Sequence, residues 1–293
     1  RYLNAVFDGT DYVYGGLEDL YLSSGKEFTL NGLLNVGNSV TLTPEFFGLH
    51  AHRYPGGTTP SVDVTFHTTR SHDYSPTAGS TRWHAIEPSD GTWVWTSLDQ
   101  WVTTHEAAGR DMIYTLGHPA AWASARPLES RAYGNGSAAE PASMAAWEDY
   151  CGMVASRYAG RIQVYELWNE PNLTHFYSGT KAVLSELHRR AATIIKAEDP
   201  AALICSSAVS EVYTGAAGLT YIDELLDTDD GDGGTCKDHI DILGSHNYLT
   251  TSTAAKCYEG MTNLVALRTA HGLAAKPIWI TEVGLLNPLL DLL

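Results

Sequence analysis

The amino-acid sequence predicts an α/β protein with the architecture of a (β/α)₈ (TIM) barrel. From residue 46 onward, apolar segments of strand length alternate with amphipathic segments of helix length, which is typical of a parallel sheet covered by helices. Seven strand segments of this kind are present, and nearly all of them end in polar or aromatic residues. Because the carboxyl ends of barrel strands meet at one face, where functional groups gather, this pattern favours a barrel over an open sheet.

The expected elements follow one another in the order that this fold requires. Strands are expected at residues 46–52, 62–69, 111–117, 161–168, 201–207, 239–246 and 277–281. Helices are expected at residues 95–108, 142–158, 182–197, 221–227 and 258–271. Gly109 and Gly272 each follow a helical segment and Pro200 closely follows another, and both residue types are typical of helix ends.

The chain divides into two regions. Residues 1–44 are rich in Gly, Tyr, Leu and Thr with turn signals, which predicts a β-rich N-terminal extension of short strands and hairpins. Residues 45–293 contain the predicted barrel, but the eleven residues after Glu282 are too few for an eighth strand and its helices. We expect that the recorded chain stops before the last strand; the alternative is that the N-terminal segment fills its place.

The composition of the 293-residue chain narrows the classes of partner. A formal net charge of −16 disfavours nucleic acid and anionic membrane surfaces, and no run approaches the roughly 18 apolar residues of a membrane helix. The N-terminus has no initiator Met and no signal-peptide layout, so a mature or trimmed end fits, and we expect a secreted or extracytoplasmic protein. The sequence carries no signal for the oligomeric state.

The four cysteines form no C-x-x-C pair, which gives little support to a zinc site or a redox motif. Cys205 is most simply a small buried apolar residue. Cys236 and Cys257 flank one predicted strand, and a disulfide between them is one interpretation. The acidic segment 227–234 resembles a calcium loop, but Gly231 stands where that pattern requires Asp or Asn, which favours an ordinary turn.

Two glutamates stand at the ends of apolar strands. Glu170 lies in the stretch "VYELWNEPN", and Glu282 lies in "PIWITEVG". The two residues are 112 positions apart, a spacing that fits strands four and seven on opposite sides of a barrel mouth. Hydrolysis of a glycosidic bond needs two carboxyl groups, one to protonate the leaving oxygen and one to attack the anomeric carbon or activate water. The two glutamates can therefore reach one cleft with the right chemistry.

The flanking residues resemble a known group of enzymes. "ELWNEPN" looks like the acid/base motif, and "PIWITEVG" like the nucleophile strand, of the retaining glycoside hydrolases of clan A. "RSHD", "YTLGHPAAWAS" and "HNY" are similar to the ends of the second, third and sixth strands of that clan, and "RWHAIEPSDGTWVWTSLDQWV" resembles a segment of family 39. The resemblance covers most of residues 46–284. It is strongest to family 39, with family 5 next.

The resemblance implies an enzyme that hydrolyses O-glycosyl bonds by double displacement, without cofactor or metal. Glu170 would be the general acid and then the base, and Glu282 the nucleophile. Arg70 and Tyr248 would hold Glu282, and Asn169 would bind the sugar 2-hydroxyl. We also expect that Pro171 keeps Glu170 extended.

An oligo- or polysaccharide is the expected partner, and the long loops after residues 118 and 207 favour endo action. Further candidates for substrate contact lie at strand ends and in aromatic positions. The remaining substrate-binding candidates are His52, His118, Trp122, Trp168 and His246. An indole face packs well against the apolar face of a pyranose, so Trp122 and Trp168 are expected to stack on sugar. Trp83, Trp93 and Trp95 are expected to pack in the core.

Two other functions remain open at this stage. His50-Ala51-His52 ends the first strand, where amidohydrolase-like barrels place a metal pair, so a metal-dependent hydrolase is one alternative. That class does not account for "WNEPN". The second alternative is a carbohydrate-binding relative that lacks catalysis, although both glutamates are present.

Overall fold

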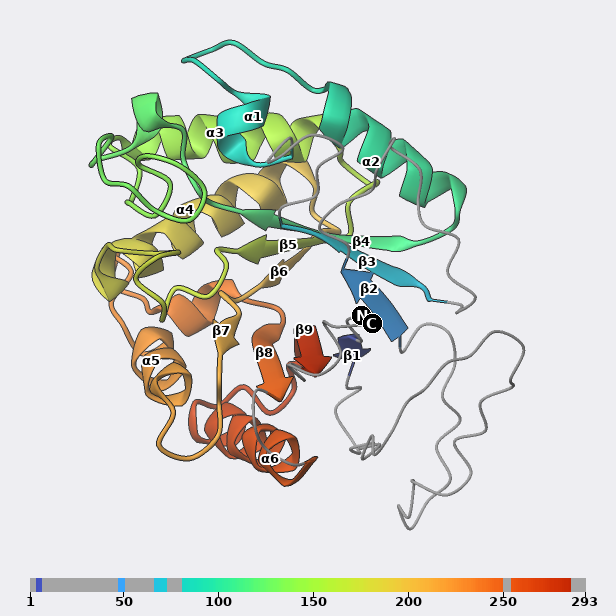
Figure 1. Ribbon diagram of the computed structural model, residues 1–293, viewed down its shortest axis with the longest axis vertical. Helices are drawn as coiled ribbons and strands as arrows, with labels where there is room; N and C mark the ends of the chain where they lie inside the picture. The colour runs from blue at the N-terminus through green and yellow to red at the C-terminus, as the bar shows by residue number, and fades with distance from the viewer. Residues whose placement is uncertain (1–3, 7–46, 51–65, 73–80, 250–253, 286–293) are drawn as a thin grey trace, which may run out of the picture.

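The fold is a barrel of parallel strands surrounded by helices. The computed structural model describes residues 4–6, 47–50, 66–72, 81–249 and 254–285, so most of the expected N-terminal extension lies outside the described residues. Figure 1 shows the helices around the outside of strands β4 to β8. This arrangement confirms the α/β barrel that the sequence predicts.

Most elements of the described residues overlap those expected from the sequence, whereas α1, β7 and the two 3₁₀ turns were not expected. The strands are β1 (Asn4–Val6), β2 (Phe47–His50), β3 (Thr68–Ser71), β4 (Asp111–Leu116), β5 (Val164–Leu167), β6 (Leu203–Cys205), β7 (Val209–Ser210), β8 (Leu243–Leu249) and β9 (Ile278–Leu285). The α-helices are α1 (Trp83–Ile86), α2 (Thr96–Ala107), α3 (Met144–Arg157), α4 (Lys181–Glu198), α5 (Ala217–Leu226) and α6 (Ala254–Ala270). Two 3₁₀ turns, η3 (Ala121–Ala123) and η4 (Cys236–His239), complete the series.

The nine strands of the sheet follow the wall of a barrel, in which the two end strands of the order are not paired with each other. Its strand order is β6-β5-β4-β3-β2-β1-β9-β8-β7. The first and last strands of this order belong to one interrupted stretch, in which β6 pairs with β5 and β7 pairs with β8. Single bridges cross the interruption, between Cys205 and Ile242 and between Asn169 and Ala208. β6 and β7 therefore share one position, and the barrel has eight positions.

The eighth position is filled by the N-terminal strand β1. It pairs antiparallel with β2 on one side and with β9 on the other, whereas the other strand pairs are parallel. As expected, no strand follows β9 among the described residues, and β1 lies beside β9 instead, which is the alternative that the sequence left open. The physical reason is that β1 pairs backbone groups on the facing edges of β2 and β9, which would otherwise need other partners.

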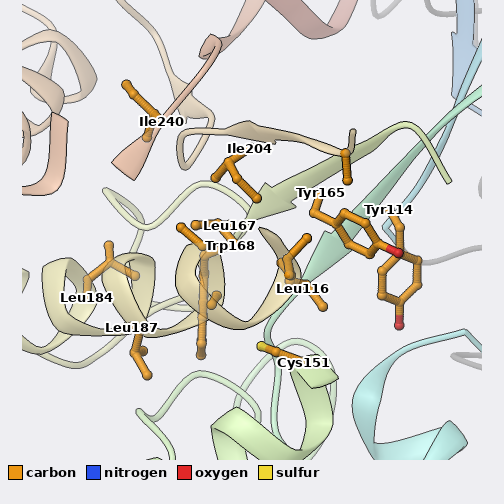
Figure 2. Packing of buried hydrophobic residues seen from close by; sticks show 14 of the residues in the cluster. Tyr114, Leu116, Cys151, Tyr165, Leu167, Trp168, Leu184, Leu187, Ile204 and Ile240 are labelled. Carbon is orange, nitrogen blue, oxygen red and sulfur yellow. The ribbon is translucent and has the colours of Figure 1, made fainter. Parts of the chain in front are cut away.

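Side chains on each strand alternate between two environments. On β5, Tyr165 and Leu167 point outward to the helices, whereas Val164 packs inside the barrel against Ile113 and Cys205. Figure 2 shows the outward layer, which includes Leu167 of β5 and Leu184 of α4. The outward layer is therefore the main hydrophobic core.

Aromatic residues dominate one part of that core. Trp83 of α1 is fully buried and stacks on Tyr150 of α3 with ring centroids 4.4 Å apart. Trp93 and Trp95 also stack on each other, at 4.9 Å, but both remain partly exposed. The expected core role therefore fits Trp83 fully and the other two only in part.

Three smaller expectations can be compared with the structure. Cys236 is a buried free thiol in η4 that belongs to the hydrophobic core, so the disulfide with Cys257 is not formed. The acidic segment is a turn closed by Asp230, whose carboxylate accepts hydrogen bonds from the backbone of Asp232 and Gly234 at 2.8 and 3.1 Å. Among the described residues, no helix combines the length and the apolar character needed to cross a bilayer.

Candidate active site

Five strands and the turns that follow them bring ionisable side chains to one place. His50 comes from β2, Arg70 from β3, Glu170 from the turn after β5, His246 from β8 and Glu282 from β9. All five are buried, with less than a tenth of their surface exposed. Buried charges are costly unless each one has a partner of opposite charge or a hydrogen bond, and these side chains are partners for one another.

The two glutamates expected from the sequence meet at His246. The Nδ1 atom of His246 lies 2.9 Å from Oε1 of Glu170 and 2.9 Å from Oε2 of Glu282. One carboxylate oxygen of each glutamate and a ring nitrogen of His246 all lie within 4.8 Å of one another. The structure thus places both carboxyl groups around one small volume at the barrel mouth.

The electrostatic surroundings favour the ionised form of Glu282. Burial by itself would raise the pKa of this carboxyl group, but the charge and hydrogen bond of His246 lower it well below its ordinary value. His50 adds to this effect from the other side, with its Nδ1 3.3 Å from Oε1. Glu282 is therefore a carboxylate at neutral pH, as a nucleophile must be.

His246 carries the complementary charge. Burial lowers the pKa of its imidazole, but Glu282 and Glu170 outweigh burial and raise it to about 9. The ring is therefore an imidazolium at neutral pH, and its Nδ1–H is shared between the two carboxyl groups. Its other nitrogen, Nε2, has no hydrogen-bond partner among the described residues.

Arg70 lies beneath Glu282 in a second charged group that includes Glu166 of β5. Its Nε donates to Oε2 of Glu166 at 2.8 Å, and its Nη2 donates to Glu166 and, at 2.8 Å, to Oδ1 of Asn169. Its Nη1 lies 3.5 Å from Oε2 of Glu282. Burial opposes the guanidinium charge, but Glu166 and Glu282 raise the pKa of Arg70 above its usual range. Nη1 also lies 3.4 Å from Nδ1 of His50, so Arg70 is shared among Glu166, Asn169, Glu282 and His50.

Sequence reasoning missed Glu166. It stands inside the apolar run "VYEL", is fully buried, and also accepts hydrogen bonds from Thr115 at 2.7 Å and from Thr281 at 2.6 Å. A carboxylate buried in a strand requires a partner of opposite charge. That requirement was the available signal, since Arg70 follows a predicted strand that is only two positions away in the barrel.

Backbone strain marks the ends of β4 and β5. Three residues other than glycine have left-handed backbone here, namely His118 (φ 55°), Trp168 (φ 74°) and Glu170 (φ 41°). We expected Pro171 to keep Glu170 extended, and this is wrong. The backbone N–H of Glu170 donates to the carbonyl of Ala208 at 2.8 Å, which holds the turn and aims the carboxyl group at His246.

Of the two tryptophans expected to stack on sugar, only Trp168 is placed so that it cannot do so. Trp168 is 1% exposed, packs in the core, and donates from Nε1 to the carbonyl of Phe176 at 2.9 Å. Its ring lies so close to Gly117 that a Cβ there would come within 2.9 Å of it. Trp168 therefore has no face available to a sugar. Trp122 is partly exposed and donates to the carbonyl of Glu87 at 2.9 Å.

The remaining candidates lie near the strand ends. His118 is buried, with its Nδ1 3.2 Å from the carbonyl of Ser137, and its ring lies 5.3 Å from that of His72. Tyr248 is half-buried on β8, two residues beyond His246. His52 lies outside the described residues. His72 and Tyr133, whose rings also contact each other at 5.2 Å, were not expected from the sequence.

The glutamates and His246 also have the spacing of metal ligands. Two carboxylates and one imidazole suit several divalent cations. A cation in this position would have to replace the proton that His246 shares with Glu170 and Glu282. The imidazolium of His246 thus already supplies a positive charge between the two glutamates, where the metal would sit.

Comparisons with known proteins identify other structures that have the same fold. No family model matches the sequence, and no curated protein sequence matches it. Among solved structures, the chain is similar to a glucosidase from Croceicoccus marinus, with a TM-score of 0.53 and 16% identity over 78% of this chain and 49% of that one. It is also similar to a GH10 protein from Paenibacillus barcinonensis, with a TM-score of 0.53 and 16% identity over 75% of this chain and 66% of that one.

A third similar structure is a GH39 β-xylosidase from Caulobacter crescentus, with a TM-score of 0.53 and 20% identity over 75% of this chain and 50% of that one. At these identities the likeness shows a shared (β/α)₈ barrel fold. The chain spans about half to two thirds of the length of these structures.

Proposed function

We propose that this protein is a retaining glycoside hydrolase of the clan A type. The observation that carries the proposal is the approach of Glu170 and Glu282, whose carboxylate oxygens lie within 4.8 Å of each other at the barrel mouth. Retaining enzymes hold their carboxyl groups about 5–5.5 Å apart, and inverting enzymes about 6.5–9.5 Å apart. The short separation supports double displacement, and the resemblance of "ELWNEPN" and "PIWITEVG" supports the same assignment.

The first step joins the sugar to the protein. The Glu282 carboxylate attacks the anomeric carbon while the glycosidic C–O bond breaks, and protonated Glu170 gives its proton to the leaving oxygen. The low pKa of Glu282 keeps the nucleophile ionised. In the second step Glu170 removes a proton from water, the water oxygen attacks the anomeric carbon, and the ester bond to Glu282 breaks.

Asn169 and Arg70 serve the transition state in this scheme. The side-chain oxygen of Asn169 accepts a hydrogen bond from Arg70, which leaves its amide N–H groups to donate to the sugar 2-hydroxyl. Hydrogen bonds to that hydroxyl strengthen as the oxocarbenium-like transition state forms. Arg70 therefore orients Asn169 as well as facing Glu282.

The substrate class we propose is an oligo- or polysaccharide, cleaved internally, in a secreted or extracytoplasmic setting. The structural relatives named a glucosidase and a β-xylosidase favour glucosides and xylosides as the first substrates to test.

The test is the release of reducing ends from a panel of purified polysaccharides, with Glu282→Gln as the matched control. We expect release by the natural protein and none by the variant, and product lengths will distinguish internal from terminal cleavage. In parallel, 2,4-dinitrophenyl 2-deoxy-2-fluoro-β-xyloside and the corresponding glucoside are expected to label the natural protein with one sugar, detected by intact mass. Inversion of the anomeric configuration in the products would disprove the double displacement.

Glu170→Gln tests the acid. We expect it to slow hydrolysis of aryl glycosides with poor leaving groups far more than that of dinitrophenyl glycosides, because a good leaving group needs no proton. Equal losses for both would contradict the assignment. Activity that disappears with a chelator and returns with a divalent cation would instead support the amidohydrolase-like alternative. Glycan binding without release would support the non-catalytic one.

A further inference from the structure

We propose that Glu166 is a positioning residue that divides the guanidinium of Arg70 between the nucleophile and Asn169. The proposal rests on the proposed function for its catalytic consequence. The claim that Glu166 orients Arg70 depends on the geometry alone and not on the proposed function.

Glu166 fixes the orientation of Arg70. It binds Nε and Nη2 of the guanidinium through one oxygen, Oε2. Because the guanidinium is a rigid planar fork, these two contacts decide where the remaining N–H groups point. Nη1 then faces Glu282 at 3.5 Å, and Nη2 also reaches Asn169 at 2.8 Å.

Glu166 is itself held from two other strands. Thr115 of β4 donates to its Oε2 at 2.7 Å, and Thr281 of β9 donates to its Oε1 at 2.6 Å. Thr281 is the residue immediately before Glu282. The carboxylate therefore connects β3, β4, β5 and β9 at one level, directly below the nucleophile.

The stability of the fold alone does not explain why Glu166 and Arg70 form a buried ion pair here. A fully buried ion pair is often no more stable than apolar side chains of the same volume. The neighbouring inward layer of the barrel shows the apolar solution, with Ile113, Val164, Cys205 and Ile242 in contact. The same strand, one inward position further on, carries a carboxylate instead.

As a consequence, Glu166 determines how closely the guanidinium of Arg70 approaches the carboxylate of Glu282. With Glu166 present, the guanidinium has a closer anion than the nucleophile, and the contact to Glu282 stays at 3.5 Å. With a neutral residue at this position, the full charge of Arg70 would turn to Glu282. The nucleophile would lose basicity, and the oxygen of Asn169 would lose its donor.

The first test needs no substrate. In Glu166→Gln, which keeps the shape of the side chain, we expect the pKa of His246 to fall from about 9 by one unit or more, because an unshared Arg70 cancels part of the charge of Glu282. The measurement is an NMR titration of the histidine ring, assigned by the resonance missing from His246→Gln. An unchanged His246 titration in folded Glu166→Gln would overturn the proposal.

The second test uses turnover of an aryl xyloside or glucoside and its 2-deoxy analogue. We expect kcat of Glu166→Gln to fall on the order of 10²-fold, since small displacements of catalytic groups cause losses of that size. We also expect a smaller difference between the 2-hydroxy and 2-deoxy substrates, because Asn169 is no longer oriented. A general loss of stability would leave that ratio as it is in the natural protein.

The matched control is Leu167→Ala, on the outward face of the same strand. It removes a buried side chain without touching Arg70, so the His246 titration and the 2-deoxy ratio are expected to stay unchanged. Should Glu166→Gln fail to fold, Glu166→Asp keeps the charge with a shorter reach, and we expect it to retain the His246 titration but lower kcat. A shift of His246 in a protein that releases no sugar would uphold the positioning and reject the glycosidase function.

Discussion

The two faces of strand β5 differ in the kind of side chain that they bury. Outward, Tyr165 and Leu167 enter a continuous apolar layer between strands and helices. Inward, Glu166 lies one residue away among Arg70 and two threonines. The outward face gains free energy of folding from burial, about 1.5–3 kcal/mol for a side chain such as leucine. The inward face holds charges whose desolvation offsets most of their attraction, so it contributes chemistry rather than stability.

Removing the shared cation is expected to have the largest effect. Arg70→Met leaves Glu166 and Glu282 without their guanidinium partner, and breaking a buried pair in this way destabilises by about 3–5 kcal/mol. Urea unfolding will measure the loss. The double variant Arg70→Met/Glu166→Leu is expected to recover at least half of it, because no unpaired charge remains at residue 166. A double variant as unstable as the single one would show that the ion pair itself stabilises the fold.

An outward substitution of similar size sharpens the contrast. Leu116→Ala, on the buried outward face of β4, is expected to destabilise by about 2–5 kcal/mol through the cavity that it leaves. Its stability deficit is expected to be the same at pH 6 and pH 9, since the residue contacts no titrating charge of the inward group. A deficit that changed by more than about 1 kcal/mol between these pH values would show that the two faces are coupled.

Two buried histidines extend the comparison to pH. His246, with a pKa of about 9, binds its proton more tightly in the folded protein than the ordinary value of 6.5 allows. Its contribution to the free energy of unfolding is therefore complete below pH 6.5 and is lost as the pH rises to 9. Burial lowers the pKa of His188, on α4, to about 4, so its penalty grows as the pH falls from 6.5 to 4. Each effect amounts to at most about 3 kcal/mol.

A plot of the free energy of unfolding against pH falls on its alkaline side, from pH 6.5 to 9, and on its acid side, from pH 6.5 to 4. Substitution of one histidine at a time separates these two limbs. His246→Gln is expected to flatten the alkaline limb between pH 6.5 and 9, whereas His188→Gln is expected to reduce the slope of the acid limb only. Thermal unfolding across the pH range is the measurement. The acid limb will not vanish, because burial also lowers the pKa of His84 and His105 to about 4.

The smallest effect is expected at Tyr165. Its hydroxyl is buried in the outward layer and has no hydrogen-bond partner among the described residues. Tyr165→Phe removes a desolvated polar group and is expected to change the free energy of unfolding by less than about 1 kcal/mol, in the stabilising direction. A clear destabilisation in urea unfolding would mean that a water molecule satisfies the hydroxyl.

The contrast between the faces also explains what the sequence could predict. The outward layer follows strand and helix periodicity, so the elements of the barrel were recognisable, and both glutamates stand at strand ends where polar residues interrupt the pattern. Glu166 was hidden because it occurs singly within an apolar run. Its four donors come from residues 70, 115 and 281, and only the folded barrel brings them together.

Local backbone geometry accounts for the other differences. Trp168 turns outward directly after the outward Leu167 because its left-handed φ of 74° breaks the alternation of the strand. No pattern of residue types announces such a turn at tryptophan. β1 has only three residues, too few for periodicity, and its place between β2 and β9 follows from the barrel rather than from its own sequence.

The left-handed residues at the mouth have a consequence for how such a sequence changes over generations. His118, Trp168 and Glu170 occupy backbone that glycine or asparagine adopts more readily. Under selection for folding alone, mutation would relax these positions first. Glycine at residue 170 in a natural descendant would therefore record that the proposed hydrolysis had ceased to matter, even where the barrel and Glu282 were still intact.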